Sequence, residues 1–156
     1  MKKIISVLLV IIAVFLVSCS DAESFVTTDY SVDAFADAIP DGIVYQNGSE
    51  RELDGDFLDY YFGNKDLLLE VDSYVFITSP TTSVNEAGVF KITSESARET
   101  LIKAFETRRG NLIQTHTNYS AEDLAISEGM TIGSFDDIVY FIATPDNASI
   151  EALIKK

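Results

Sequence analysis

Residues 138–144 read IVYFIAT, a stretch that is apolar at nearly every position and rich in β-branched and aromatic side chains. Strands that are buried on both faces show such continuous apolar runs, whereas a strand with one solvated face alternates. The stretch therefore predicts a central strand of a sheet. Pro145 ends it, and Asp146 is well placed to cap a last helix from Ala148 to Ile154.

The segments before this strand predict a hairpin and a long helix. Strand-like runs at Ser73–Thr78 and Gly88–Thr93 flank a stretch of turn composition, so we expect them to pair. Ser96 and Glu99 have the spacing of a capping box at the start of the longest helix, Glu95–Thr115. Shorter elements are expected at Val32–Ile39, Ile43–Tyr45, Phe57–Phe62, Ala121–Ser127 and Thr131–Ile132, the last followed by a turn at Ser134–Asp137.

This order of elements predicts an α+β fold. We expect a small, mostly antiparallel sheet of three to four strands, packed with one long helix and several short helices. The length of 156 residues favours one domain.

The chain begins with two lysines and an almost wholly apolar run, Ile4–Val17. As a helix this run spans about 21 Å, short of the roughly 30 Å hydrocarbon core of a bilayer, so a signal peptide is favoured over a transmembrane helix. The run closes with Leu16-Val17-Ser18-Cys19, which resembles the bacterial lipobox. That motif implies cleavage between Ser18 and Cys19 and a diacylglyceryl group on the Cys19 thiol.

The expected organisation is a signal peptide at 1–18, an acylated Cys and flexible tether at 19–28, and a single α+β domain at 29–156. Two acyl chains hold a protein stably on a membrane, so the domain would stand on the outer face of the bacterial cytoplasmic membrane, as a monomer. Two alternatives stay open. Cys19 could be incidental beside an ordinary cleavage site after Ser20, or the apolar segment could remain as an uncut anchor.

The net charge of the chain restricts the classes of molecule that it can bind. The chain carries 25 acidic and 11 basic residues, a formal net charge of −14, which repels nucleic acid. The stretch from Asp54 to Asp56 begins like a calcium loop, but the required turn glycine is missing and Lys65 stands where the bidentate glutamate is needed. At most, Asp54, Asp56 and Asp59 attract cations; no specific metal site and no cofactor is expected.

No constellation of catalytic side chains is recognisable in the sequence. The only Cys is assigned to lipid, the only His, His116, is expected to be solvated or to cap a helix, and a Gly-x-Ser-x-Gly nucleophile motif is absent. Arg108 and Arg109 are expected on a solvated helix face or in intramolecular ion pairs. One aromatic cluster should place two or three side chains in the core and one on the surface: Phe57, Tyr60, Tyr61 and Phe62.

Several segments together resemble a known family. They are Tyr61-Phe62-Gly63, the strand at Tyr74–Ser79, Asn85–Lys91 leading into the long helix, Tyr119, and the late aliphatic strand. Over Val32–Lys155 the chain resembles the bacterial lipoprotein family called domain of unknown function four-three-five-eight. It departs from that pattern at Gly110 and at Ser120-Ala121, where a proline is expected. The resemblance implies one extracytoplasmic domain on a lipid anchor and supplies no catalytic or binding residues.

The functional expectation is a lipid-anchored extracytoplasmic lipoprotein that acts as a non-catalytic binding or interaction module for a protein or cell-envelope partner. A cell-envelope hydrolase that uses carboxylates and an envelope-maintenance protein without a discrete ligand are the alternatives. An enzyme requires a deep pocket with converging polar groups, whereas a module requires only a shallow patch or groove.

Overall fold

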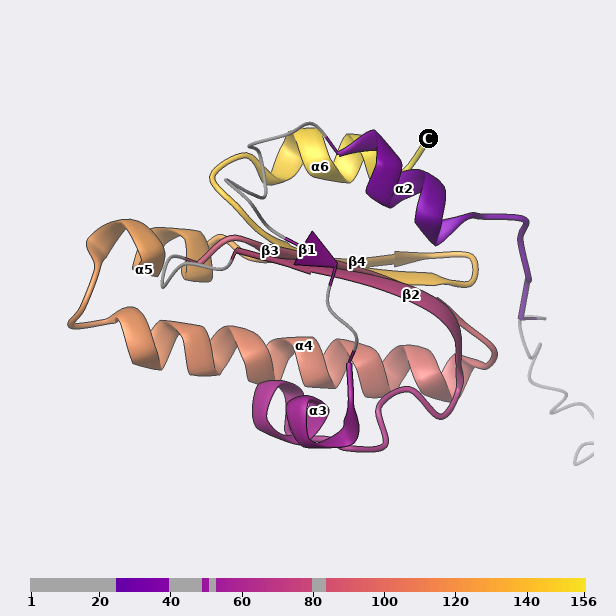
Figure 1. Ribbon diagram of the computed structural model, residues 1–156, viewed down its shortest axis with the longest axis horizontal. Helices are drawn as coiled ribbons and strands as arrows, with labels where there is room; N and C mark the ends of the chain where they lie inside the picture. Colours follow the sequence, from indigo (N-terminus) through magenta and orange to yellow (C-terminus); the bar gives the residue numbers. More distant parts are fainter. Residues whose placement is uncertain (1–24, 40–48, 51–52, 80–83) are drawn as a thin grey trace, which may run out of the picture.

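The computed structural model describes residues 25–39, 49–50, 53–79 and 84–156. Within these ranges the chain forms the helices and strands shown in Figure 1. The helices are α2 (Val32–Ala38), α3 (Gly55–Phe62), α4 (Glu95–His116), α5 (Ala121–Glu128) and α6 (Asn147–Ile154). The strands are β1 (Ser49–Glu50), β2 (Val71–Thr78), β3 (Glu86–Ile92), β4 (Thr131–Phe135) and β5 (Ile138–Ala143). The strand expected at Ile43–Tyr45 lies outside the described residues.

The strands form one antiparallel sheet in the order β1-β2-β3-β5-β4. β2 and β3 pair as the predicted hairpin, and β5 lies between β3 and β4 with every residue buried, which confirms the predicted interior strand. The predicted α+β class is confirmed. β4 extends to Phe135, so the turn expected at Ser134–Asp137 is shorter than predicted and is confined to Asp136 and Asp137.

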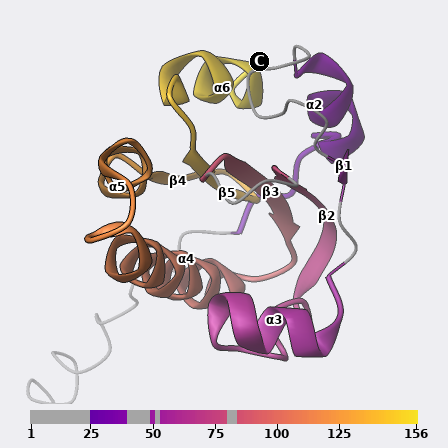
Figure 2. The same cartoon turned by 60° about the vertical axis from the view of Figure 1, so that its left-hand side comes forward.

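Helices cover both faces of the sheet, as Figures 1 and 2 show. α2 and α6 pack on one face through Val32, Phe35, Ile150 and Ile154. The longer α4, with α3 and α5 beside it, packs on the other face. There Phe105 lies between two other buried rings, with centroid distances of 5.9 Å to Phe62 and 4.7 Å to Phe141. Successive side chains of the strands point to opposite faces of the sheet and thus build two separate hydrophobic clusters.

Side-chain caps begin the described helices. Ser31, Ser120 and Asp146 each accept a backbone N–H from the first turn of the helix that follows, which confirms the cap predicted at Asp146. The capping box predicted at Ser96 is wrong, because Ser94 caps α4 by accepting the N–H of Ala97. Ser96 instead lies inside the first turn, where its hydroxyl is 2.7 Å from a carboxylate oxygen of Glu70.

The tether expected at 19–28 ends earlier than predicted. Phe25 packs against the hydrophobic cluster under α4, and Thr28 forms hydrogen bonds with Asp137. The predicted domain boundary at Asp29 therefore lies inside the folded part of the chain. Among the described helices, not one combines the length and the apolar character that crossing a membrane requires.

Candidate functional site

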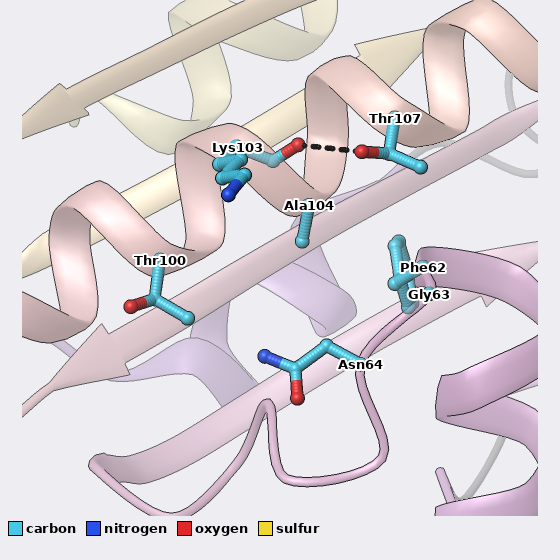
Figure 3. A pocket seen from close by; sticks show the side chains of 7 residues that line it. All are labelled: Phe62, Gly63, Asn64, Thr100, Lys103, Ala104 and Thr107. Atoms are coloured by element: carbon cyan, nitrogen blue, oxygen red, sulfur yellow. Dashed lines mark hydrogen bonds between the residues drawn. The ribbon is translucent and has the colours of Figure 1, made fainter.

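A surface cavity of about 250 Å³ lies where the C-terminal end of α3 meets the middle of α4. Figure 3 shows the side chains around it, which come from α4 on one side and from the end of α3 and the following loop on the other. Its lining consists of Phe62, Gly63, Asn64, Thr100, Lys103, Ala104 and Thr107.

The two walls of the cavity follow from local helix rules. On α4, Thr100, Lys103 and Thr107 are three or four positions apart, a spacing that places them on one helical face. The other wall begins where α3 stops at Gly63, whose φ of 70° is the left-handed conformation that glycine adopts without a steric penalty. The chain then turns, and Figure 3 shows Asn64 reaching from this loop toward α4.

Most polar atoms around the cavity are already bonded to the backbone. The hydroxyl of Thr100 donates to the carbonyl of Ser96 at 2.9 Å, and that of Thr107 donates to the carbonyl of Lys103 at 3.0 Å. The side-chain oxygen of Asn64 accepts the N–H of Asp66 at 3.0 Å. The hydroxyls of these threonines therefore have no proton left to donate to a ligand.

Two donors remain for a bound molecule. Within the described part of the chain, neither the Lys103 ammonium nor the Asn64 amide nitrogen has a protein partner. Both are donors, and one carries a positive charge. The ring of Phe62 and the methyl of Ala104 also line the cavity, which therefore combines a cationic donor on one wall and an amide donor on the other with apolar surface.

The carboxylates considered for cation binding take other positions. Asp54 caps α3 by accepting the N–H of Phe57 at 2.8 Å, and Asp56 and Asp59 are exposed on that helix. Across the described ranges, no three His, Cys, Asp or Glu side chains are grouped closely enough to hold a metal ion. Ser18 and Cys19 lie outside the described residues.

His116 is not solvated, so the first of the two roles predicted for it is wrong. It is 6% exposed, in the last turn of α4, because α5 folds back over this end of the helix. Its Nδ1 lies 3.8 Å from a carboxylate oxygen of Asp123 on α5. The other oxygen of Asp123 accepts the N–H of Val84 at 3.0 Å, which holds the segment just before β3 against α5. The contacts described for His116 and Asp123 therefore serve to hold neighbouring segments of the fold together.

The arginine doublet forms intramolecular ion pairs, one of the two arrangements predicted for it. Arg108 pairs with Glu86 and Arg109 pairs with Glu106. The aromatic prediction is also confirmed. Phe62 is buried, Phe57 and Tyr61 pack against the core, and only one side chain of the cluster is exposed, that of Tyr60 at 83%.

Asn64 and Lys103 are not among the residues predicted from the sequence. The helical spacing of Thr100, Lys103 and Thr107 was visible, but an exposed polar face of a helix shows the same pattern. The cavity arises from the contact of two segments about forty positions apart, which no local pattern predicts.

Comparison with known proteins places the chain in a family. No curated protein and no solved structure matches it. Residues 44–144, more than half of the chain, match one family, and the range includes both walls of the cavity. The resemblance found in the sequence is therefore confirmed. The chain belongs to the family described as Domain of unknown function (DUF4358).

Proposed function

We propose that this protein is a bacterial lipoprotein, held on the outer face of the cytoplasmic membrane by a diacylglyceryl group on Cys19. Its folded domain acts as a non-catalytic binding module, and the cavity between α3 and α4 is its ligand site. The lipobox at Leu16–Cys19 supports the anchor. The single observation that carries the binding role is the pair of unengaged donors, Lys103 and Asn64, which line one cavity together with the apolar Phe62 and Ala104.

The charge of the cavity suggests the ligand class. In a chain of net charge −14, Lys103 makes the cavity locally cationic. A carboxylate accepts hydrogen bonds from an ammonium and an amide at once, and charge-assisted bonds of this kind are the stronger ones. At about 250 Å³ the cavity is slightly smaller than typical sites for drug-sized molecules, so it suits a small carboxylate or the acidic end of a larger one.

The binding role is tested by titrating isotope-labelled protein with acetate and propionate, and separately with acetamide, while recording amide NMR signals. We expect the two carboxylates, but not acetamide, to shift the signals of Gly63, Asn64 and Thr100. Lys103→Gln should weaken carboxylate binding about tenfold or more, since a hydrogen bond to a charged group contributes about 1.5–3 kcal/mol and each 1.4 kcal/mol is about tenfold in affinity.

Lys65→Gln is the matched control. It removes the same charge from an exposed lysine just after Asn64 that does not line the cavity. If both lysine variants bind the carboxylates equally, or if acetamide shifts the same signals, the cavity is not a carboxylate site.

The anchor is tested separately, with Cys19→Ala in the expressing cells. We expect the wild-type protein to sediment with membranes and to carry lipid on an N-terminal Cys19 by mass spectrometry, and the variant to lose both properties. A mature chain that begins at Asp21 without lipid would exclude the anchor.

A further inference from the structure

A buried polar contact ties the N-terminal segment to the far end of the chain. The N–H of Thr28 donates to one carboxylate oxygen of Asp137 at 2.9 Å, and its hydroxyl donates to the other at 2.5 Å. The Lys91 ammonium donates to the carbonyl of Thr28 at 2.7 Å and lies 3.9 Å from Asp137. We call Thr28, Lys91 and Asp137 the N-terminal clasp. Because Asp137 is 0% exposed, loosening the clasp leaves a buried charge without partners.

The clasp fixes where the chain joins the domain. The carbonyl of Asp137 accepts the N–H of Ile92 at 2.8 Å, and Thr93 donates its N–H to the carbonyl of Glu70 at 2.9 Å. These contacts gather the N-terminal segment, the β4–β5 turn, the end of β3 and the start of β2 at one end of the sheet, next to the first turn of α4. Figure 1 shows this end at the right.

That end exposes two large apolar side chains. Val26, two residues before the clasp, is 53% exposed, and Leu69, next to Glu70, is 81% exposed. The opposite end carries α5 and Tyr119, which follows α4 and is 74% exposed. α4 has 22 residues and separates the two ends by about 33 Å at 1.5 Å per residue.

Only a short segment of the chain separates the proposed lipid on Cys19 from the N-terminal clasp. Phe25 already packs on the domain, and Cys19 lies six residues before it. Whatever its conformation, a segment of six residues spans at most about 21 Å. A lipid on Cys19 therefore brings this end of the sheet, and not the end with α5, close to the headgroups.

We propose that the end of the domain bearing Val26 and Leu69 is apposed to the lipid bilayer, while α5 and Tyr119 face away from it. This inference rests on the lipid anchor of the proposed function. The two apolar side chains lose water at the membrane interface, and the clasp transmits the position of the anchor to the whole domain. Partners in the envelope then meet the end with α5 first.

The orientation is tested on full-length lipidated protein in phosphatidylcholine vesicles. Because the lipid occupies the thiol of the sole native Cys, Leu69→Cys and Tyr119→Cys each introduce one reactive thiol for an environment-sensitive nitrobenzoxadiazole label. Both positions are exposed, so labelling does not disturb the core. On vesicles we expect a blue shift and protection from iodide quenching at residue 69, and neither change at residue 119.

The outcomes separate this inference from the anchor itself. Mass spectrometry and vesicle flotation first establish that each labelled protein carries lipid and is bound. If it does not carry lipid, the proposed anchor fails. If it is lipidated and bound but the two labels respond alike, or residue 119 responds more strongly, the proposed orientation is wrong.

Discussion

Arg108 on α4 and Glu86 at the start of β3 form a buried, two-pronged ion pair. The Nε and Nη2 atoms of Arg108 donate to the two carboxylate oxygens of Glu86 at 2.9 and 2.8 Å. The guanidinium also lies over the ring of Tyr61 on α3, with Cζ 3.6 Å from the ring centroid. Burial opposes the charge of Arg108, but the hydrogen bond and charge of Glu86 outweigh it and raise the pKa of the guanidinium. One contact therefore joins β3, α3 and α4.

Removing one partner of this pair should destabilise the fold strongly. Arg108→Met leaves the Glu86 carboxylate buried without its partner, and we expect a loss of about 3–5 kcal/mol in the free energy of unfolding. The double variant Glu86→Leu with Arg108→Met should recover most of that loss. Urea denaturation of the singles and the double gives the coupling energy.

The neighbouring pair provides the control for this prediction. Arg109 and Glu106 pair on the helix surface, with side chains 35% and 45% exposed, so Arg109→Met should cost less than about 1 kcal/mol. Equal losses for the two arginine variants would contradict a special role of the buried pair.

Two glycines should respond to alanine in opposite directions. A Cβ at Gly133 would overlap the ring of Tyr140, whose hydroxyl donates to Glu151 at 2.5 Å and so cannot move freely. A Cβ at Gly110, inside α4, meets no atom within 4 Å. We expect Gly133→Ala to lower stability by about 1–3 kcal/mol and Gly110→Ala to raise it by about 1 kcal/mol. Thermal unfolding monitored by circular dichroism measures both; stabilisation by Gly133→Ala would show that the ring is not held.

The elements predicted well are those whose signal is local. The apolar run at Ile138–Thr144 and the helical spacing in Glu95–Thr115 depend on neighbouring residues, and both elements are found within two residues of the expected ends. The cap of α4 was misplaced because Ser94 and Ser96 are chemically alike. Only the backbone decides between them, and Ser94 has the extended conformation that a cap requires, with φ −154° and ψ 160°.

The features that were missed depend on distant residues. His116 is buried because α5 folds back over the end of α4, and the cavity forms because the loop that carries Asn64 lies opposite the face of α4 that carries Lys103. Thr28 lies in a polar segment without periodicity, which predicted a tether; its partner Asp137 is 109 positions away. Polar pairing over such separations leaves no periodic pattern in the sequence.

The clasp predicts a difference between two adjacent threonines. Thr28→Val removes the hydroxyl donor to the buried Asp137 carboxylate while nearly preserving shape, and should cost about 1.5–3 kcal/mol. Thr27 is exposed, so Thr27→Val should change stability by no more than about 0.5 kcal/mol. Urea midpoints of the two variants test this. Matching midpoints would mean that the hydroxyl of Thr28 contributes little to holding the N-terminal segment.

The last prediction concerns alkaline pH. The hydroxyl of Tyr30 is buried without a hydrogen-bond partner in the described part of the structure, and burial raises its pKa from 10.0 to about 12. Between these two values the unfolded chain releases the Tyr30 proton while the folded chain keeps it. Stability must therefore fall as pH rises from 10 to 12, and below pH 10 this contribution is constant.

Tyr30→Phe removes both the ionisation and the unsatisfied hydroxyl. At pH 7 the variant should be as stable as the wild type, or more stable by about 1 kcal/mol, because the buried oxygen loses no partner. From pH 10 to 12 its stability should fall less steeply than that of the wild type. Urea unfolding at pH 7, 10 and 12 measures both effects, with Tyr60→Phe on an exposed ring as the control at pH 7. A loss of stability at pH 7 in Tyr30→Phe would mean that the hydroxyl has a hydrogen-bond partner, which would contradict this prediction.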